Sequence, residues 1–159
     1  MVHTVLANNL TVADLRRRSG RPPRTFPIDT PLRTLRRQLS RDRWRGRAFV
    51  IDGDRHVIGV IEVERLAAWL FPMDAAAQHA DGTATLRLNR MSATRVADLV
   101  GAAPACVRDQ TPVRDLIAIL IRERAAEAPV VDEQGRLIGQ VDLEQVLSAC
   151  ASPAEGHPP

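Results

Sequence analysis

The most telling absences from this 159-residue sequence are lysine and tyrosine. All 22 basic residues are arginine, a bias typical of a GC-rich, bacterial genome that says nothing about function. Aromatic residues make up only 3% of the chain, so few rings are available for stacking against nucleic-acid bases. Catalytic patterns are also missing, because no Ser-His-Asp order, glycine-rich phosphate loop or suitably spaced carboxylate pair appears. We therefore expect no enzyme, and we interpret the four histidines as scattered: His3, His56, His79 and His157.

Cysteines and long apolar runs are equally scarce. Cys106 and Cys150 have no Cys or His neighbours at the spacing of metal ligands, so we expect reduced thiols and no metal site. The longest apolar runs, such as Leu116 to Ile121, are far shorter than the roughly 20 residues that cross a bilayer. The N-terminus shows no secretory pattern. The sequence predicts a cytoplasmic chain without a membrane span.

What the sequence does contain is an internal repeat, and its hydrophobic content of 45% is enough to build a core. Thr-Val-Ala-Asp-Leu at 11–15 returns as Arg-Val-Ala-Asp-Leu at 95–99. Thr-Pro at 30–31 returns at 111–112, and Val-Ile-Asp at 50–52 returns as Val-Val-Asp at 130–132. The offset between the copies drifts only from 84 to 80 residues. Two copies of one small domain explain this order.

Each copy predicts the order strand, helix, strand, strand, helix. Thr-Pro at 30–31 and at 111–112 indicates a helix start, with threonine as the N-cap and proline at the first helical position. The apolar segments 47–52 and 128–132 are each followed by a turn, Gly53-Asp54 in one copy and Gln134-Gly135 in the other, which predicts a β-hairpin. The returning strands, 57–61 and 137–141, lead into amphipathic segments at 63–71 and 143–150.

The repeat also sets the expected domain boundaries. We expect a first domain at 1–71, a connector at 72–94 with a short strand around 85–88, and a second domain at 95–151. The tail at 152–159 contains proline and glycine, and we expect it to be disordered.

The ordered set of features, repeated twice, closely resembles a tandem pair of CBS domains, a Bateman module, over Thr11 to Cys150. The second copy is the more typical one. The resemblance implies an α/β (α+β) fold of two β-α-β-β-α CBS repeats packed about a pseudo-twofold axis. It also implies a regulatory or sensor module that binds an adenosyl ligand in clefts and regulates a linked or partner enzyme, channel or transporter.

The family's ligand signature runs glycine, two apolar residues, Thr or Ser, two variable residues, then Asp or Asn. The two key positions hold Glu62 and Arg65 in one copy, and Asp142 and Gln145 in the other. A carboxylate in place of the hydroxyl repels a phosphate by about 1 to 4 kcal/mol at about 4 Å. AMP and S-adenosylmethionine therefore remain candidate ligands, and ATP is disfavoured.

Alternatives stay open for these four residues and for the cleft walls. Asp142 and Gln145 form either a capping box, which we favour, or a ligand contact. Arg65 either pairs with Glu62 or offers its guanidinium to an anion. We interpret the apolar residues expected along the walls of the ligand clefts as core residues, which contact adenine only if the clefts are open: Phe26, Ala48, Val50, Val107, Ala128 and Val130.

Two surfaces suggest partners. The segment 113–124 is apolar over more than one face, so we expect one face to pack on its own sheet and the other to form a homodimer of open orientation. The interface residues we expect are Trp69, Phe71, Ile117, Ile119, Leu120 and Ile121.

Residues 16–47 contain twelve arginines against Asp29 and Asp42. We favour a solvated helix face for this cluster, and the alternative is a basic patch that binds nucleic acid or an anionic partner.

Overall fold

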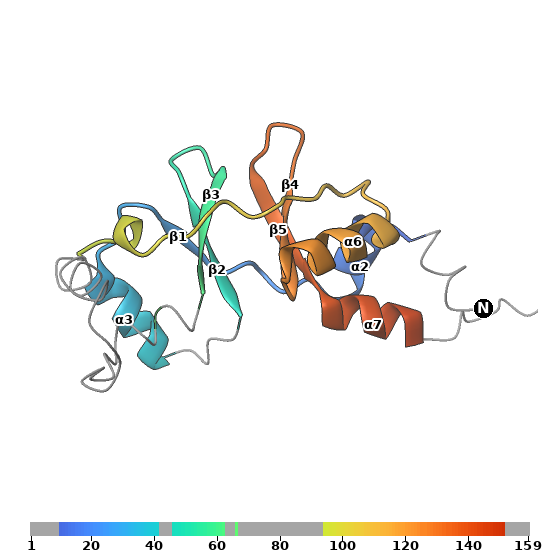
Figure 1. Cartoon of the computed structure of the whole chain (residues 1–159), viewed down its shortest axis with the longest axis horizontal. Coiled ribbons are helices and arrows are strands. Elements are labelled where there is room, and N and C mark those ends of the chain that lie inside the picture. Colours follow the sequence, from blue (N-terminus) through green and yellow to red (C-terminus); the bar gives the residue numbers. More distant parts are fainter. Residues whose placement is uncertain (1–9, 42–45, 63–65, 67–93, 152–159) are drawn as a thin grey trace, which may run out of the picture. The chain divides into compact units, whose positions relative to one another are not determined.

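The computed structural model describes residues 10–41, 46–62, 66 and 94–151 (Figure 1). The features expected at Arg65, Trp69, Phe71, the connector at 72–93 and the tail at 152–159 lie outside these residues. The chain divides into two compact units. Unit 1 contains residues 1–23 and 104–159, and unit 2 contains residues 24–103.

Unit 1 is built on an antiparallel hairpin of β4 (Glu127–Val131) and β5 (Leu137–Asp142). Helices α2 (Val12–Ser19), α6 (Val113–Glu123) and α7 (Leu143–Ala151) pack against this hairpin (Figure 1). The first strand that the repeat predicts for the second copy, before α6, is a single parallel bridge between Val107 and Val130. The buried core consists of Val12, Leu15, Val107, Val113, Leu116, Leu120, Ala128, Val130, Val141, Val146 and Ala149.

Unit 2 contains a three-stranded sheet in the order β1-β2-β3. Its strands are β1 (Thr25–Pro27), β2 (Arg47–Ile51) and β3 (Val57–Glu62), with β1 parallel and β3 antiparallel to β2. Helix α3 (Leu32–Arg41) and the 3-10 helix η1 (Val96–Asp98) complete the described part of the unit. Its core consists of Phe26, Leu32, Leu35, Ala48, Val50, Ile61, Leu66 and Val96.

The segment that opens each repeat packs in the unit built from the other repeat. Helix α2 opens the first repeat but belongs to unit 1, where the N–H of Val12 donates to the carbonyl of Thr111 at 3.0 Å. In the same way η1 opens the second repeat but belongs to unit 2, where the N–H of Val96 donates to the carbonyl of Thr30 at 2.8 Å. The compact units therefore interleave the two sequence copies.

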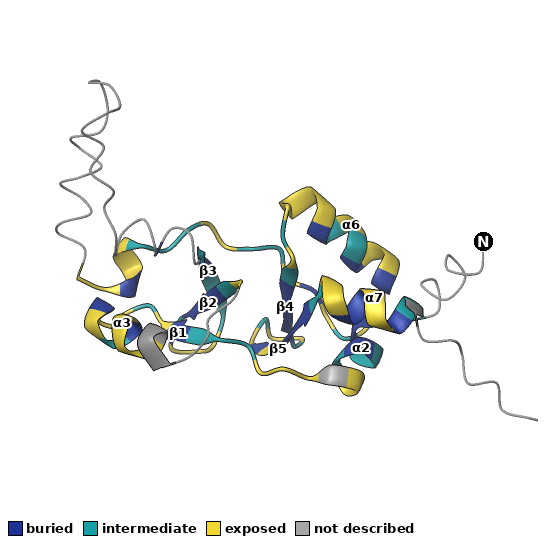
Figure 2. Cartoon of the chain, turned by 90° about the horizontal axis from the view of Figure 1, so that it is seen from below, coloured by how far each residue is buried: buried dark blue, intermediate teal, exposed yellow. Residues whose placement is uncertain are grey.

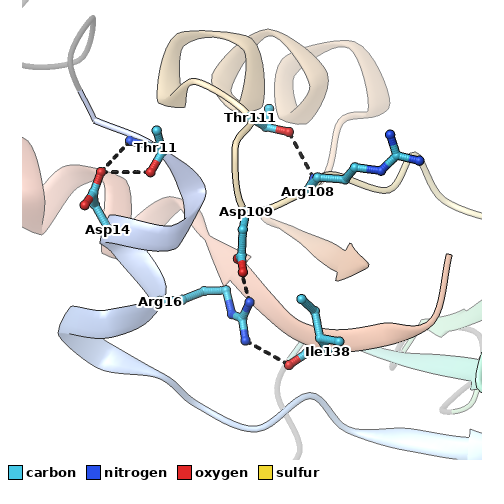
Figure 3. Close-up of polar contacts among 7 residues, drawn as sticks. All are labelled: Thr11, Asp14, Arg16, Arg108, Asp109, Thr111 and Ile138. Carbon is cyan, nitrogen blue, oxygen red and sulfur yellow. Dashed lines mark hydrogen bonds and ion pairs between the residues drawn. The ribbon is translucent and has the colours of Figure 1, made fainter. Parts of the chain in front are cut away.

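The expected cap at the Thr-Pro steps is wrong by one position. Helix α6 begins at Val113, and Pro112 occupies its N-cap with φ −61° and ψ 143°. The hydroxyl of Thr111 instead accepts the N–H of Arg108 at 3.0 Å (Figure 3). The reason is that the first helical N–H, from Val113, donates to the carbonyl of Leu10 at 2.9 Å, so no side-chain cap is needed there.

The two hairpin turns form as predicted, and an aspartate organises each. Asp52 accepts the N–H groups of Asp54 and His56, both at 2.9 Å. Asp132 accepts those of Gln134 at 3.0 Å and Arg136 at 2.8 Å. The backbone enters the left-handed region at matching places, with φ 70° at Arg55 and 80° at Gly135. The first turn therefore places this strain on Arg55 rather than on the neighbouring Gly53.

Helix α6 has a buried face and an exposed face (Figure 2). Leu120, which we expected at the dimer interface, is only 3% exposed and belongs to the core of unit 1. Ile117 and Ile119 are partly buried against the same core. Ile121 is 73% exposed, and Leu147 of α7 is 61% exposed. Exposed apolar side chains are thus present on both α6 and α7.

Candidate ligand site

Unit 1 contains a pocket of about 450 Å³. Its walls come from α2, the segment that follows α2, the loop before α6, and the first half of β5. The residues that line it are Ala13, Arg16, Arg17, Gly20, Arg21, Pro22, Pro23, Asp109, Ile138, Gly139 and Gln140. Segments far apart in the sequence therefore form one hollow within a single compact unit.

Arg16 is held at two points in this pocket (Figure 3). Its Nη1 donates to Oδ1 of Asp109 at 2.6 Å, and its Nη2 donates to the carbonyl oxygen of Ile138 at 3.0 Å. The side chain of Arg16 is 26% exposed and that of Asp109 is 42% exposed. The ion pair is therefore partly shielded from water on the arginine side and open to it on the aspartate side.

A bulge in the hairpin and a glycine make room for this guanidinium. Val130 lies opposite Gly139 and Val131 lies opposite Leu137, which leaves Ile138 as the extra residue whose carbonyl accepts Arg16. A Cβ on Gly139 would lie 2.7 Å from Nε of Arg16. Any side chain at position 139 would therefore displace Arg16.

The remaining polar residues of the pocket give it an excess of donors. Arg17 pairs with Asp14, whereas Arg21 makes no ion pair with another residue that the structure describes. Gln140 is only 7% exposed, and its side chain has no hydrogen-bond partner among the described residues. A buried amide without a partner costs about 1 to 3 kcal/mol. The pocket thus offers arginine charge and the amide of Gln140 to a small polar anion.

The equivalent place in unit 2 is filled by an apolar side chain. With the 84-residue offset of the repeat, Val100 takes the position of Arg16. A Cβ on Gly59, the counterpart of Gly139, would lie 2.2 Å from Cγ2 of Val100 and 2.6 Å from the carbonyl oxygen of Gly101. The N–H of Gly101 also donates to the carbonyl of Val60 at 2.8 Å. Gly59 therefore lies against a packed apolar segment.

The structure settles part of what the ligand signature left open. The capping box at α7 is confirmed: the N–H of Asp142 donates to Oε1 of Gln145 at 2.9 Å, and the N–H of Gln145 donates to Oδ1 of Asp142 at 2.8 Å. In unit 2, Oε1 of Glu62 lies 3.0 Å from Nη2 of Arg47, while Arg65 lies outside the described residues. Neither Asp142 nor Gln145 lines the pocket.

The apolar wall residues expected from the sequence are all buried in the two cores, and the pocket in unit 1 does not include them: Phe26, Ala48, Val50, Val107, Ala128 and Val130. Sequence reasoning missed Arg16 and Asp109 as pocket residues. The available signal was the contrast between Arg16 and Val100 at one position of the repeat.

Within residues 10–41, 46–62, 66 and 94–151 there is no cluster of three or more His, Cys, Asp or Glu side chains suited to a metal ion. No helix in this part of the chain has the length and apolar character needed to cross a membrane.

A pair of repeated α+β units, each with a hairpin covered by helices, defines the class of fold. The sequence matches the CBS domain family over residues 12–71 and 96–152, so this chain belongs to that family and is a CBS pair, a module of the regulatory class. A comparison with curated proteins gave no match.

Solved structures of CBS proteins share the fold. A structure of CBSX2 in complex with AMP has 23% identity and a TM-score of 0.67, covering 89% of this chain and 96% of that one. A CBS domain-containing protein from Thermotoga maritima has 21% identity and a TM-score of 0.64, with 88% and 93% covered. The CBS domain of a bacterial CNNM/CorC family Mg²⁺ transporter has 19% identity and a TM-score of 0.66, with 93% and 79% covered.

Proposed function

We propose that this chain is a sensor whose unit 1 pocket binds an adenosyl ligand with a single phosphate, and that binding regulates a linked or partner protein. The observation that carries this proposal is the pocket itself. Its volume of about 450 Å³ lies within the range of roughly 300 to 1,000 Å³ that is usual for small-molecule sites. The CBSX2 structure contains AMP, which supports AMP as the first ligand to test.

The residues around the pocket favour one phosphate over three. Arg16 and Arg21 can neutralise a monophosphate. The N-terminus of α7, where a longer phosphate chain would find free N–H groups, is already capped because Asp142 accepts the N–H of Gln145. The carboxylate of Asp142 also repels a phosphate brought close to it. AMP therefore fits better than ATP.

Calorimetric titration with AMP, S-adenosylmethionine and ATP tests the proposal. We expect AMP to bind at least tenfold more tightly than ATP, which corresponds to about 1.4 kcal/mol. The double variant Asp142→Thr with Gln145→Asp restores the family's signature and should strengthen ATP binding. ATP binding as tight as that of AMP, or no binding by any of the three ligands, would contradict the proposal.

The alternative function, binding of nucleic acid or another anionic partner, rests on the arginine cluster. The structure places Arg16, Arg17 and Arg21 at the pocket of unit 1, and exposed arginines Arg33, Arg36 and Arg37 on α3 of unit 2. Part of the cluster is thus assigned to the pocket. We expect duplex DNA to bind weakly and without sequence preference, and sub-micromolar, sequence-selective binding at physiological salt would reverse this ranking.

A further inference from the structure

We propose that Arg16 determines the specificity of the unit 1 pocket. It exchanges the carboxylate of Asp109 for the phosphate monoester of a ligand, and because unit 2 has Val100 instead, each chain binds one ligand. This inference rests on the proposed function, since it names the residue that selects the anion in the same pocket.

The geometry of the ion pair favours the exchange. A guanidinium has five N–H donors, and Arg16 gives one to Asp109 and one to Ile138 among the described residues. Asp109 thus receives a single hydrogen bond from Arg16, whereas a phosphate can accept two parallel N–H bonds from one guanidinium. The side chain of Asp109 is 42% exposed, so water can solvate its carboxylate after release.

The bond to Ile138 keeps Arg16 in place during the exchange. It comes from Nη2, whereas the bond to Asp109 comes from Nη1, so the first can persist when the second is replaced. The backbone also remains joined, because the N–H of Ala13 donates to the carbonyl of Asp109 at 3.0 Å. A change at either side chain therefore leaves the docking of α2 intact.

Unit 2 lacks both parts of this device. Position 100 holds valine, whose Cγ2 lies within 2.2 Å of where a Cβ on Gly59 would be. The position that corresponds to Asp109 in the repeat is Ile28, which packs partly buried against the core of unit 2. At these two positions unit 2 has neither the cation nor the carboxylate, so it has no counterpart of the Arg16 and Asp109 pair.

Calorimetry with AMP, adenosine and inorganic phosphate tests the proposal on four proteins. Arg16→Val copies the residue of unit 2, Asp109→Asn removes the competing carboxylate, and Arg18→Val is the matched control, an exposed arginine of α2 that does not line the pocket. Circular dichroism checks that each variant is folded.

In the wild type we expect one AMP per chain, bound at least tenfold more tightly than adenosine. Arg16→Val should bring AMP and adenosine to nearly equal affinity, and Arg18→Val should preserve their difference. Asp109→Asn should strengthen AMP binding by up to about fivefold, because a partly exposed ion pair no longer competes. Two AMP per chain, an unchanged preference in Arg16→Val, or weaker AMP binding in Asp109→Asn would overturn the proposal.

A second measurement separates this proposal from the proposed function. The Nε–Hε signal of Arg16, assigned by its loss in Arg16→Val, is followed by nitrogen-15 NMR as inorganic phosphate is added at constant ionic strength. We expect a saturable shift that occurs at lower phosphate concentration in Asp109→Asn. If neither AMP nor adenosine binds but this shift occurs, the adenosyl function fails and the anion site stands. If phosphate binds as tightly as AMP, free phosphate is the ligand. The absence of any shift overturns the role of Arg16.

Discussion

The two units build their hairpins in the same way and differ at the place where unit 1 has its pocket. Both use an aspartate to organise the hairpin, Asp52 in one and Asp132 in the other. The second strand of each hairpin, β3 or β5, contains a bulge just before a glycine. In unit 2, however, Val100 packs against this glycine, Gly59, whereas in unit 1 Arg16 lies against Gly139. The two units thus share a scaffold, and two positions of the repeat separate an apolar contact, with Val100 and Ile28, from a charged pocket, with Arg16 and Asp109.

The first test of this comparison adds one methyl group at each glycine. In Gly59→Ala the new Cβ meets the backbone oxygen of Gly101 at 2.6 Å as well as Val100, so unit 2 must shift and we expect a loss of about 1 to 3 kcal/mol in unfolding free energy. In Gly139→Ala the three atoms nearest to the new Cβ all belong to the flexible end of Arg16. We expect a smaller loss there, together with weaker AMP binding. Chemical denaturation checks both, and equal losses would contradict the comparison.

The helices at the matching positions α6 and α3 also differ, and this concerns assembly. Helix α6 exposes Ile121 at 73%, whereas α3 exposes the arginines Arg33, Arg36 and Arg37. We predict a homodimer formed through the apolar surface of α6, and Ile121→Arg should dissociate it without unfolding the chain. Arg37→Ala is the control and should leave it intact. Sedimentation at tens of micromolar checks this, and a monomeric wild type would count against the interface.

Much of this architecture follows from the sequence because the repeat presents each signal twice. The hairpins, the closing helix of the second copy and the capping box of Asp142 and Gln145 are local patterns, set by residues three or four positions apart. The pocket is different, because Arg16 and Asp109 are 93 residues apart. Only the exchange of α2 into unit 1 brings them together. No local pattern encodes that exchange, which depends on backbone bonds such as that from Val12 to Thr111.

The hairpin turns allow a finer comparison. Both turns require a positive φ, which glycine adopts freely and a residue with a Cβ adopts at a cost of roughly 1 to 2 kcal/mol. Gly135→Arg, which copies the first turn, should therefore destabilise the chain by about 1 kcal/mol. Arg55→Gly should stabilise it by less, because the side chain of Arg55 has an interaction of its own that glycine loses. Thermal and chemical denaturation measure both, and a neutral Gly135→Arg would show that the turn relaxes.

The smallest expected effect is on the unfolding free energy at acidic pH. It concerns Asp14 and Asp98, the aspartates in the segments that open the two repeats. Hydrogen bonds from the N–H and hydroxyl of Thr11 lower the pKa of Asp14, and those from the N–H groups of Arg95 and Thr94 lower the pKa of Asp98. A folded pKa below the unfolded value stabilises the chain above the unfolded pKa, near 4, and this contribution is lost as pH falls through the folded pKa.

We therefore expect the unfolding free energy to fall below about pH 4. Asp14→Asn and Asp98→Asn should each lower stability at neutral pH and flatten this decline. Because Asp14 serves unit 1 and Asp98 serves unit 2, the two changes should be additive. Denaturation midpoints measured between about pH 3 and pH 7 test this, with Asp115→Asn as the control, an exposed aspartate in the first turn of α6. A decline as steep in the double variant as in the wild type would show that other carboxylates govern acid unfolding.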